Sequence, residues 1–163
     1  MATRDPALAL EPQTAAHAEE MFALLSDPKI YRYENAPPAS LEWLRERFGK
    51  LESRRSPDGR EKWLNWVIRL ESGEAAGYVQ ATVHADGHAA IAYVLGSRFW
   101  DRGIGRSAVS SLLRILREEH GVERFTAVLK SANQRSRLLL ERLGFSEGTF
   151  PVDADEVAMQ REA

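Results

Sequence analysis

The stretch "RFWDRGIGRSAV", residues 98–109, places two glycines one residue apart, after an apolar run and before a helical pattern. Because glycine has no β-carbon, a turn built on Gly103 and Gly105 lets successive backbone N–H groups converge on an anion at close range. The helix that begins there adds N–H donors and the positive end of its dipole, and Arg102 and Arg106 add positive charge. The segment therefore predicts a phosphate or pyrophosphate site; the alternative is that the glycines only let the helix pack tightly on a strand.

The same letters, "GIGRSA" at residues 103–108, also match the dinucleotide fingerprint G-x-G-x-x-A. That fingerprint normally lies in the first strand-helix-strand unit of a parallel sheet, whereas an antiparallel hairpin precedes it here and about 60 residues follow. The chain has no Gly-Lys-Ser or Gly-Lys-Thr ending of a Walker loop. Both nucleotide-binding readings are thus disfavoured.

Composition narrows the class of protein. The 163 residues are 44% hydrophobic and 28% charged, which is typical of one globular domain, predicted over residues 1–163. The absence of cysteine excludes thiolate chemistry and cysteine metal sites, and four scattered histidines indicate no metal centre. A net charge of −2 argues against a nucleic-acid surface, and the pattern lacks a membrane span or secretory signal. A cytoplasmic protein without membrane partners is expected.

The hydrophobic pattern of the first half predicts a short strand near residues 7–10 and two helices. Thr14 can cap the first helix, which runs to about Leu25, and Ser40 can cap the second. Apolar residues of the second helix recur at spacings of three and four and predict one buried stripe: Leu41, Leu44, Phe48 and Leu51.

Strand-like runs dominate the middle of the chain, at residues 63–70, 75–84 and 88–95. The pair Asp86-Gly87 between the last two predicts a tight hairpin, because such turns need positive φ angles. A third helix follows the glycine turn, and the remaining elements are a strand "RFTAVL" (124–129), a helix (133–143) and two last strands at "GF" and "DEVAMQ". The fold class is α+β, with a mixed, mostly antiparallel sheet flanked by about four helices.

Two segments in this order resemble the GNAT superfamily of acetyl-CoA-dependent N-acyltransferases, specifically its RimJ/RimL-like branch. "WDRGIGRSA" (residues 100–108) resembles the glycine turn of that branch, and "NQRSRLLLERLGF" (residues 133–145) resembles its N-x-x-S-x-x-x-x-E-K/R-L-G-F segment. The elements follow the family's order over nearly the whole chain. One departure is Asp101, which stands where the branch usually has its first glycine.

The resemblance implies a single-domain GNAT fold that binds acetyl-CoA and no metal. In the family the backbone of the turn binds the pyrophosphate of coenzyme A. The end of the preceding strand splays from its neighbour, and its main-chain groups hold the pantetheine arm and polarise the thioester. The asparagine and the serine of the second segment lie beside that arm in the family. The implied cofactor-binding residues are Tyr93, Val94, Leu95, Arg102, Gly103, Ile104, Gly105, Arg106, Ser107, Asn133 and Ser136.

Direct attack of an amine on a thioester needs a neutral amine, a stabilised oxyanion and a protonated leaving thiolate. An N–H near Val94 and Leu95 is the expected oxyanion donor. Many relatives have an acidic tyrosine seven residues after the asparagine, where this chain has Leu140. Ser136 is therefore the candidate that hydrogen-bonds or protonates the thiolate.

The general base is the least defined part of the site. Relatives often have a glutamate on the fourth strand, but this chain has alanines at Ala89 and Ala90, which leaves Glu34, His84 and His88 as candidates. The missing carboxylate favours an amine of low pKa, such as a protein N-terminus, over lysine. The expected partners are acetyl-CoA and an amine, with monomer and homodimer both open; the alternative function is a non-catalytic module that binds acyl-CoA.

Overall fold

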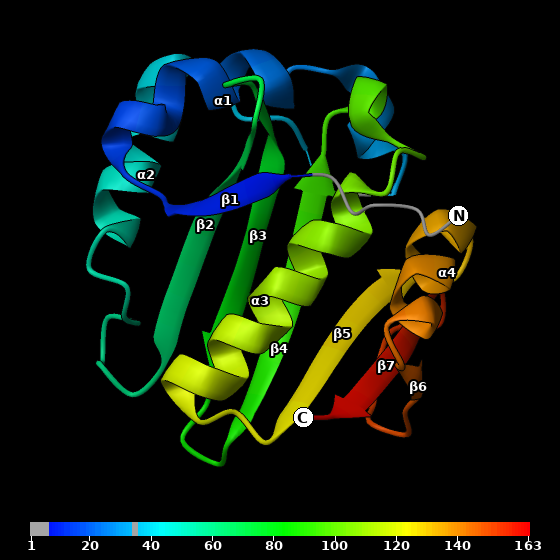
Figure 1. Cartoon of the computed structure of the whole chain (residues 1–163). Coiled ribbons are helices and arrows are strands. Elements are labelled where there is room, and N and C mark those ends of the chain that lie inside the picture. The colour runs from blue at the N-terminus through cyan, green and yellow to red at the C-terminus, as the bar shows by residue number, and fades with distance from the viewer. Residues whose placement is uncertain (1–6, 34–35) are drawn as a thin grey trace.

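A computed structural model describes residues 7–33 and 36–163 of the chain, which build a seven-stranded mixed sheet (Figure 1). The strand order is β1-β2-β3-β4-β5-β7-β6, and the pairs are antiparallel except for the parallel pair of β4 and β5. The strands are β1 (Leu8–Pro12), β2 (Lys62–Leu70), β3 (Ala75–Val83), β4 (His88–Leu95), β5 (Arg124–Lys130), β6 (Ser146–Glu147) and β7 (Glu156–Glu162). The predicted mixed, mostly antiparallel sheet is confirmed.

Four α-helices accompany the sheet, as the hydrophobic pattern predicted: α1 (Ala18–Leu25), α2 (Leu41–Leu51), α3 (Ile104–His120) and α4 (Gln134–Arg142). The Ser40 side chain accepts a hydrogen bond from the Trp43 backbone N–H at 3.0 Å, which fixes the start of α2. The first helix differs in detail, since Thr14 precedes a short 3₁₀ turn (Ala15–His17) that leads into α1. Further 3₁₀ turns cover Pro28–Arg32 and Ser97–Phe99.

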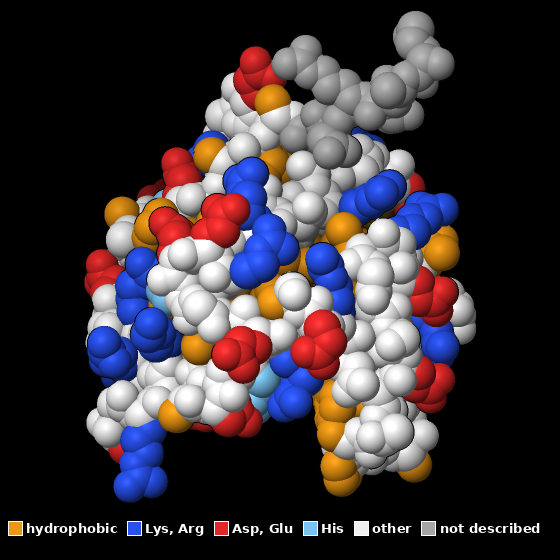
Figure 2. All heavy atoms as spheres, turned by 60° about the horizontal axis from the view of Figure 1, so that its bottom comes forward, with side chains coloured by type: hydrophobic (Ala, Val, Ile, Leu, Met, Phe, Trp, Pro, Cys, Tyr) orange, Lys and Arg blue, Asp and Glu red, His pale blue; other side chains and the backbone are white. Residues whose placement is uncertain are grey.

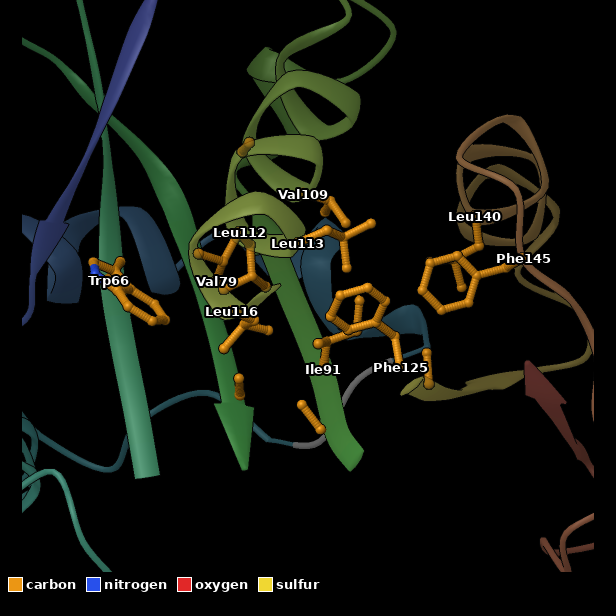
Figure 3. Packing of buried hydrophobic residues seen from close by; sticks show 14 of the residues in the cluster. Trp66, Val79, Ile91, Val109, Leu112, Leu113, Leu116, Phe125, Leu140 and Phe145 are labelled. Atoms are coloured by element: carbon orange, nitrogen blue, oxygen red, sulfur yellow. The ribbon is translucent and has the colours of Figure 1, made fainter. Parts of the chain in front are cut away.

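The core follows from the two periodicities of the sequence, two in the strands and 3.6 in the helices. Alternate residues of β3, β4 and β5 pack against the apolar stripe of α3, as Val79, Ile91, Phe125, Leu112 and Leu116 illustrate (Figure 3). A second cluster joins α1 and α2 to the other strand positions, among them Val67 and Val94. The sheet is therefore buried on both faces over its central strands.

The turn between β3 and β4 is a hairpin, as Asp86-Gly87 predicted, but with a different turn geometry. The His84 N–H bonds the His88 carbonyl at 2.9 Å, and the Gly87 N–H bonds the His84 carbonyl at 3.2 Å. Gly87 has a φ of +90°, whereas Asp86 has a negative φ. A three-residue loop that ends in a left-handed glycine thus closes the hairpin, in place of a two-residue turn.

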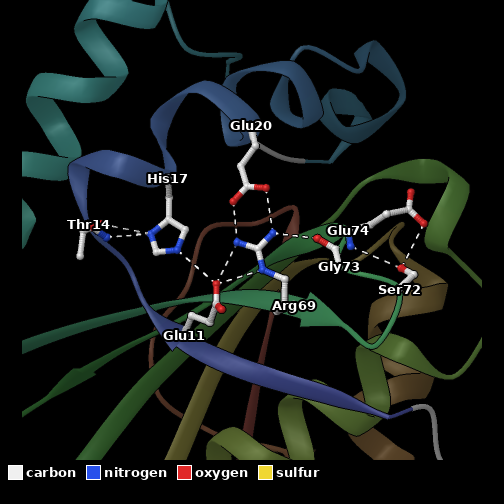
Figure 4. A network of polar contacts seen from close by, with 8 residues as sticks. All are labelled: Glu11, Thr14, His17, Glu20, Arg69, Ser72, Gly73 and Glu74. Atoms are coloured by element: carbon white, nitrogen blue, oxygen red, sulfur yellow. Dashed lines mark hydrogen bonds and ion pairs between the residues drawn. The ribbon is translucent and has the colours of Figure 1, made fainter.

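Arg69 on β2 joins β1 and α1 through a network of charges (Figure 4). Its guanidinium bonds Glu11 at 2.8 Å and Glu20 at 2.6 Å, and also donates to the Gly73 carbonyl at 3.1 Å. The hydrogen bonds from Arg69 lower the pKa values of both glutamates. This network fixes the first strand and helix to the sheet at the end where β4 reaches Leu95.

The parallel pairing of β4 with β5 is short, and this shapes the rest of the molecule. Only His88, Ala89 and Ala90 are in register with β5, at Arg124, Phe125 and Thr126. Beyond Ala90 the two strands diverge, so the last three residues of β4, Tyr93, Val94 and Leu95, are not paired with β5. Within the described residues, no helix has the length and apolarity needed to cross a membrane.

Candidate active site

A cavity of ≈ 390 Å³ lies where β4 has diverged from β5, between the end of β4, the start of α3 and the start of α4. Eight of the residues implied by the resemblance line it: Tyr93, Val94, Leu95, Gly103, Gly105, Arg106, Asn133 and Ser136. These residues are up to 43 positions apart in the chain. The divergence of β4 from β5 therefore brings the two sequence motifs together at one opening.

The glycine turn forms one wall of this cavity. Gly103 is the N-cap of α3 and has a φ of +78°, in the left-handed region that side chains rarely adopt. Among the described residues no side chain caps this helix, so its first N–H groups lie uncapped at the cavity wall. Gly105 plays a packing role as well, because a β-carbon there would come within 3.0 Å of Leu139 Cδ1. The packing interpretation therefore holds for Gly105, and anion binding at the turn of Gly103 stays a prediction.

Positive charge predominates in the lining. The described lining contains four cations, Lys29, Arg106, Arg135 and Arg142, and one carboxylate, that of Asp101. An uncapped helix N-terminus and several cations are the combination that binds phosphate groups. The residues present therefore fit a pyrophosphate-containing ligand.

Asp101, the departure from the family pattern, takes an unusual backbone conformation for a residue with a side chain. Its φ is +58°, so it occupies the left-handed region in which the family's glycine would be free of strain. Its carboxylate is 75% exposed and accepts a hydrogen bond from Arg135 Nε at 3.3 Å. Arg135 in turn stacks over the Trp100 ring at 4.2 Å from its centroid. The carboxylate thus faces a guanidinium at the rim of the cavity.

Ser136 occupies the opposite wall, at the start of α4. Asn133 caps that helix, and its Oδ1 accepts the Ser136 N–H at 3.2 Å. The Ser136 Oγ lies 2.6 Å from the Tyr93 hydroxyl of β4. Leu140, one turn further along α4, is 1% exposed and belongs to the core. The hydroxyl groups of Ser136 and Tyr93 therefore bridge the two walls of the cavity.

A second pocket of ≈ 330 Å³ lies between α2 and the sheet and shares Val94 with the cavity. Its wall combines aromatic and amide side chains, including Tyr31, Trp43, Tyr78, Asn65 and Gln80. Arg47 of α2 is the charged residue of the described lining, which contains no Asp, Glu or His. Two pockets of different chemistry thus meet at the end of β4.

Three other residues implied for cofactor binding stand outside the cavity lining. The Ile104 side chain is 3% exposed and packs in the core, Arg102 lies over the Phe99 ring at 6.0 Å, and Ser107 lines a separate hollow on α3. Their implied contact runs through the backbone, and their roles stay a prediction.

The two histidines among the candidate bases lie outside this cavity. His84 and His88 flank the β3–β4 hairpin, about 20 Å along β4 from Val94 at 3.3 Å per residue. Their rings stack at 4.2 Å, and they pair with Glu61 at 2.8 Å and Asp86 at 2.5 Å. Glu34 lies outside the described residues. Neither histidine lines the cavity or the second pocket.

The hairpin face carries its own hollow, lined by Arg55, Arg60, Lys62, His84 and His120 together with Asp86 and Glu123. Figure 2 shows this end of the molecule, where cationic, acidic and histidine side chains are intermixed. Among residues 7–33 and 36–163, no group of three or more His, Asp or Glu side chains is placed to hold a metal ion.

Sequence reasoning missed the side chain of Tyr93 and the lining residues Lys29, Tyr33 and Arg135. Tyr93 was assigned a main-chain role, and strand alternation could have shown its side chain: it shares a face with Ile91 and Leu95, toward α3 and α4. Lys29 and Tyr33 come from the Pro28–Arg32 turn and the residue after it, for which the sequence offers no pattern.

Comparison with known proteins adds a family to this geometry. Residues 7–146 match the family model described as "Acetyltransferase (GNAT) domain". The chain belongs to the GNAT acetyltransferase family. No curated protein sequence matches the chain closely enough to show a relationship.

Solved structures share the GNAT fold with this chain at low sequence identity. A domain from Methanocaldococcus jannaschii superposes with a TM-score of 0.77 at 24% identity, covering 98% of this chain and 100% of that one. RimL, a ribosomal L7/L12 alpha-N-protein acetyltransferase in complex with coenzyme A, gives 0.80 at 20% identity, with 95% and 93% covered. The aminoglycoside acetyltransferase AAC(6')-Ib in complex with coenzyme A gives 0.79 at 19% identity, with 96% and 95% covered.

Proposed function

We propose that this GNAT protein transfers an acetyl group from acetyl-CoA to a primary amine of low pKa, as a RimJ/RimL-like enzyme. The observation that carries the proposal is the meeting of two pockets at Val94, one cationic beside an uncapped helix N-terminus and one aromatic with amides. The first suits the pyrophosphate of a coenzyme A thioester, and the second suits an amine. Val94 and Leu95 lie where the thioester and the amine would meet.

The residues have distinct parts in this reaction. The α3 N-terminus and Arg106 hold the pyrophosphate, and the diverged end of β4 offers backbone groups to the pantetheine arm and the thioester oxygen. Ser136 hydrogen-bonds the sulfur that leaves. Since the two substrates occupy fixed neighbouring pockets, most of the rate gain comes from orientation, and the amine attacks the carbonyl directly.

The second pocket favours an amine that is easily deprotonated. Removing the proton from a lysine-type amine of pKa roughly 10.4 costs about 4 to 5 kcal/mol at neutral pH, and from an α-amine near 7.7 to 8.0 about 1 kcal/mol. The described lining offers no carboxylate or imidazole to accept that proton. An α-amine needs only water for this step.

The charge of the pocket also disfavours polycationic acceptors. Arg47 repels a second ammonium group and attracts a carboxylate, and the aromatic wall with Trp43, which is 50% exposed, favours an apolar substituent. The proposed acceptor is therefore an α-amine that carries an apolar or aromatic side chain, such as the first residue of a peptide.

A thiol-release assay with acetyl-CoA and a matched amine panel tests the proposal. A peptide with a free α-amine, the same peptide with only its lysine free, and a polyamine are compared at neutral pH. Turnover that is fastest with the α-amine supports the proposal, and a clear preference for lysine refutes it. Binding of acetyl-CoA without turnover on any amine would instead identify a non-catalytic acyl-CoA-binding module.

The charge of Arg47 supplies a second test. Arg47→Glu should lower kcat/KM for a carboxylate-bearing acceptor about tenfold and raise the relative rate with the polyamine. The reason is that the charge of the described pocket lining changes from positive to negative. Arg45→Glu makes the same charge change on the same helix but outside the pocket lining, and should leave the acceptor preference unchanged. Equal effects of the two variants would exclude Arg47 as an acceptor contact.

A further inference from the structure

We propose that Tyr93 is the proton donor that acts through Ser136 when the thiolate leaves, an inference that rests on the proposed acetyl transfer. The two hydroxyl groups are in contact at 2.6 Å, although Tyr93 comes from β4 and Ser136 from α4. Both line the cavity that fits the coenzyme A thioester. Tyr93 was implied only as a backbone contact, so this assigns a role to its side chain.

The contact is set up by features that lie outside the two residues. Tyr93 faces the α3 and α4 side of the sheet, because Val94, its neighbour, faces α1 and α2. The Asn133 cap fixes the first turn of α4 and so fixes the Ser136 backbone. The Tyr93 hydroxyl also donates to the Ser136 backbone carbonyl at 3.3 Å, a longer contact than the one to Oγ, in which either hydroxyl can be the donor. The shorter contact is the one through which a proton moves.

Acid strength explains why Ser136 needs this partner. A tyrosine hydroxyl has a pKa near 10 and a thiol near 8.5, so the two are about 1.5 units apart, whereas an aliphatic hydroxyl is a far weaker acid. Ser136 alone can hydrogen-bond the sulfur, but if it gave up its proton its side chain would become an alkoxide of high free energy. When Tyr93 replaces that proton, the negative charge rests on a phenolate.

The proton balance of the step is complete. The amine nitrogen forms a bond to the carbonyl carbon, and the carbon–sulfur bond breaks with its electron pair on sulfur. Ser136 gives its proton to sulfur, and Tyr93 gives its proton to Ser136 Oγ. The nitrogen loses a proton to water as the amide forms, and water returns a proton to the Tyr93 phenolate. Overall one proton passes from the amine to the thiol, and no other reactant is consumed.

A purely structural role for the same contact makes different predictions. If Tyr93 only ties β4 to α4, its hydroxyl affects the position of the cavity walls, and its loss weakens coenzyme A binding or lowers the melting temperature. If it donates a proton, its loss lowers kcat and leaves affinity unchanged. Tyr93→Phe separates the two, because it keeps the ring that packs on the core and removes the hydroxyl alone.

The kinetic test compares Tyr93→Phe, Ser136→Ala and the double variant with the α-amine peptide. Each single variant should lower kcat by roughly 10- to 100-fold with KM for acetyl-CoA changed less than about twofold, and the double variant should be no slower than Ser136→Ala. Ser110→Ala, on the exposed side of α3, is the control and should retain wild-type kcat. A Tyr93→Phe variant with unchanged kcat, or one that changes only KM, overturns the proposal while the proposed function stands.

A second readout does not depend on turnover. A donor aimed at sulfur stabilises the thiolate, so the thiol of bound coenzyme A should titrate at lower pH than the free thiol, followed by ultraviolet absorbance. Tyr93→Phe and Ser136→Ala should both shift that titration back toward the free thiol. If neither variant shifts it, the relay is refuted. If wild type binds coenzyme A with the shifted titration but turns over no amine, the proposed function fails and the donor pair remains as a thiolate-binding site.

Discussion

The two ends of β4 differ in pairing, and this decides which of them holds the site. At the His88 end, β4 is hydrogen-bonded to both neighbours. His84 pairs there with Glu61, and His88 pairs with Asp86. At the Leu95 end β4 has parted from β5, and the groups there face a cavity. The two histidines proposed as bases lie with their carboxylate partners at one end, and the space for a substrate lies at the other.

The comparison teaches that a site in this fold is built from backbone and space more than from acidic and basic residue types. Besides the cations of the cavity lining and Asp101, the Val94 end has two glycines in the α3 turn, a serine, an asparagine and a tyrosine, and its described lining contains no histidine or glutamate. In the proposed reaction, ligand binding depends on the left-handed Gly103, and proton transfer depends on the short contact between Ser136 and Tyr93. Substitutions at the two ends should therefore have separable effects.

The largest effect is expected for Gly103→Val. A β-branched residue at a φ of +78° forces the turn to another conformation, so coenzyme A affinity should fall at least tenfold, measured by calorimetry. Gly59→Val is the matched control: Gly59 has a φ of +73° in an open loop with no atom within 4 Å of an added β-carbon. Both variants should lose roughly 1 to 2 kcal/mol of stability. Equal affinity in the two would show that the turn does not bind the ligand.

A smaller effect in the opposite direction is expected for Asp101→Gly at the same end. The glycine relieves the backbone at a φ of +58° and removes a negative charge from the cavity rim, so affinity for coenzyme A should rise about two- to fivefold. Asp101→Asn removes the charge and keeps a residue that tolerates this φ. Higher affinity in both variants would assign the effect to the lost charge. Higher affinity in Asp101→Gly alone would assign it to relief of backbone strain. Weaker binding in both would mean that Asp101 holds Arg135 in a productive position.

The difference between the two ends also explains what could be predicted from the sequence. Fold class, the order of the strands and helices and the hairpin at Gly87 followed from local periodicity and turn residues, which act over a few positions. The glycine turn and the Asn133 segment were found as motifs, and the cavity brings eight of the implied residues together. Each of these features depends on residues that are close together in the sequence.

Two kinds of feature were beyond the sequence. The separation of β4 from β5 after Ala90 depends on how strands 36 residues apart in register pair, and only the family resemblance implied it. The size of the cavity and the distance of His84 and His88 from it could not be seen. The contact between Tyr93 and Ser136 links residues 43 positions apart. The histidines were suggested as bases by residue type alone. A sequence shows which side chains can accept a proton, but it does not show how far they lie from the cavity.

At the hairpin end the expected effects concern stability. Burial lowers the pKa of His120 below its usual 6.5, and the charges of Lys62 and Arg54 lower it further. A folded-state pKa below the unfolded value contributes stability that is present above pH 6.5 and is lost as pH falls through the folded pKa. A glutamine side chain would not titrate, so the unfolding free energy of His120→Gln should fall less on acidification than that of wild type, in denaturant titrations at about pH 7 and pH 5. An identical pH dependence in variant and wild type would contradict this.

The smallest effect on activity is expected for the histidines at that end. His84→Asn and His88→Asn, singly and together, should leave kcat and its pH profile within about twofold of wild type, because both rings lie about 20 Å along the strand from Val94. The stacked rings and their pairs with Glu61 and Asp86 make the double variant less stable, so activity is measured below its melting transition. If the double variant loses a limb of the pH profile while it stays folded, the two ends of β4 are coupled. In that case a hairpin histidine takes part in proton transfer, and the proposal that catalysis depends on the Leu95 end of β4 alone is wrong.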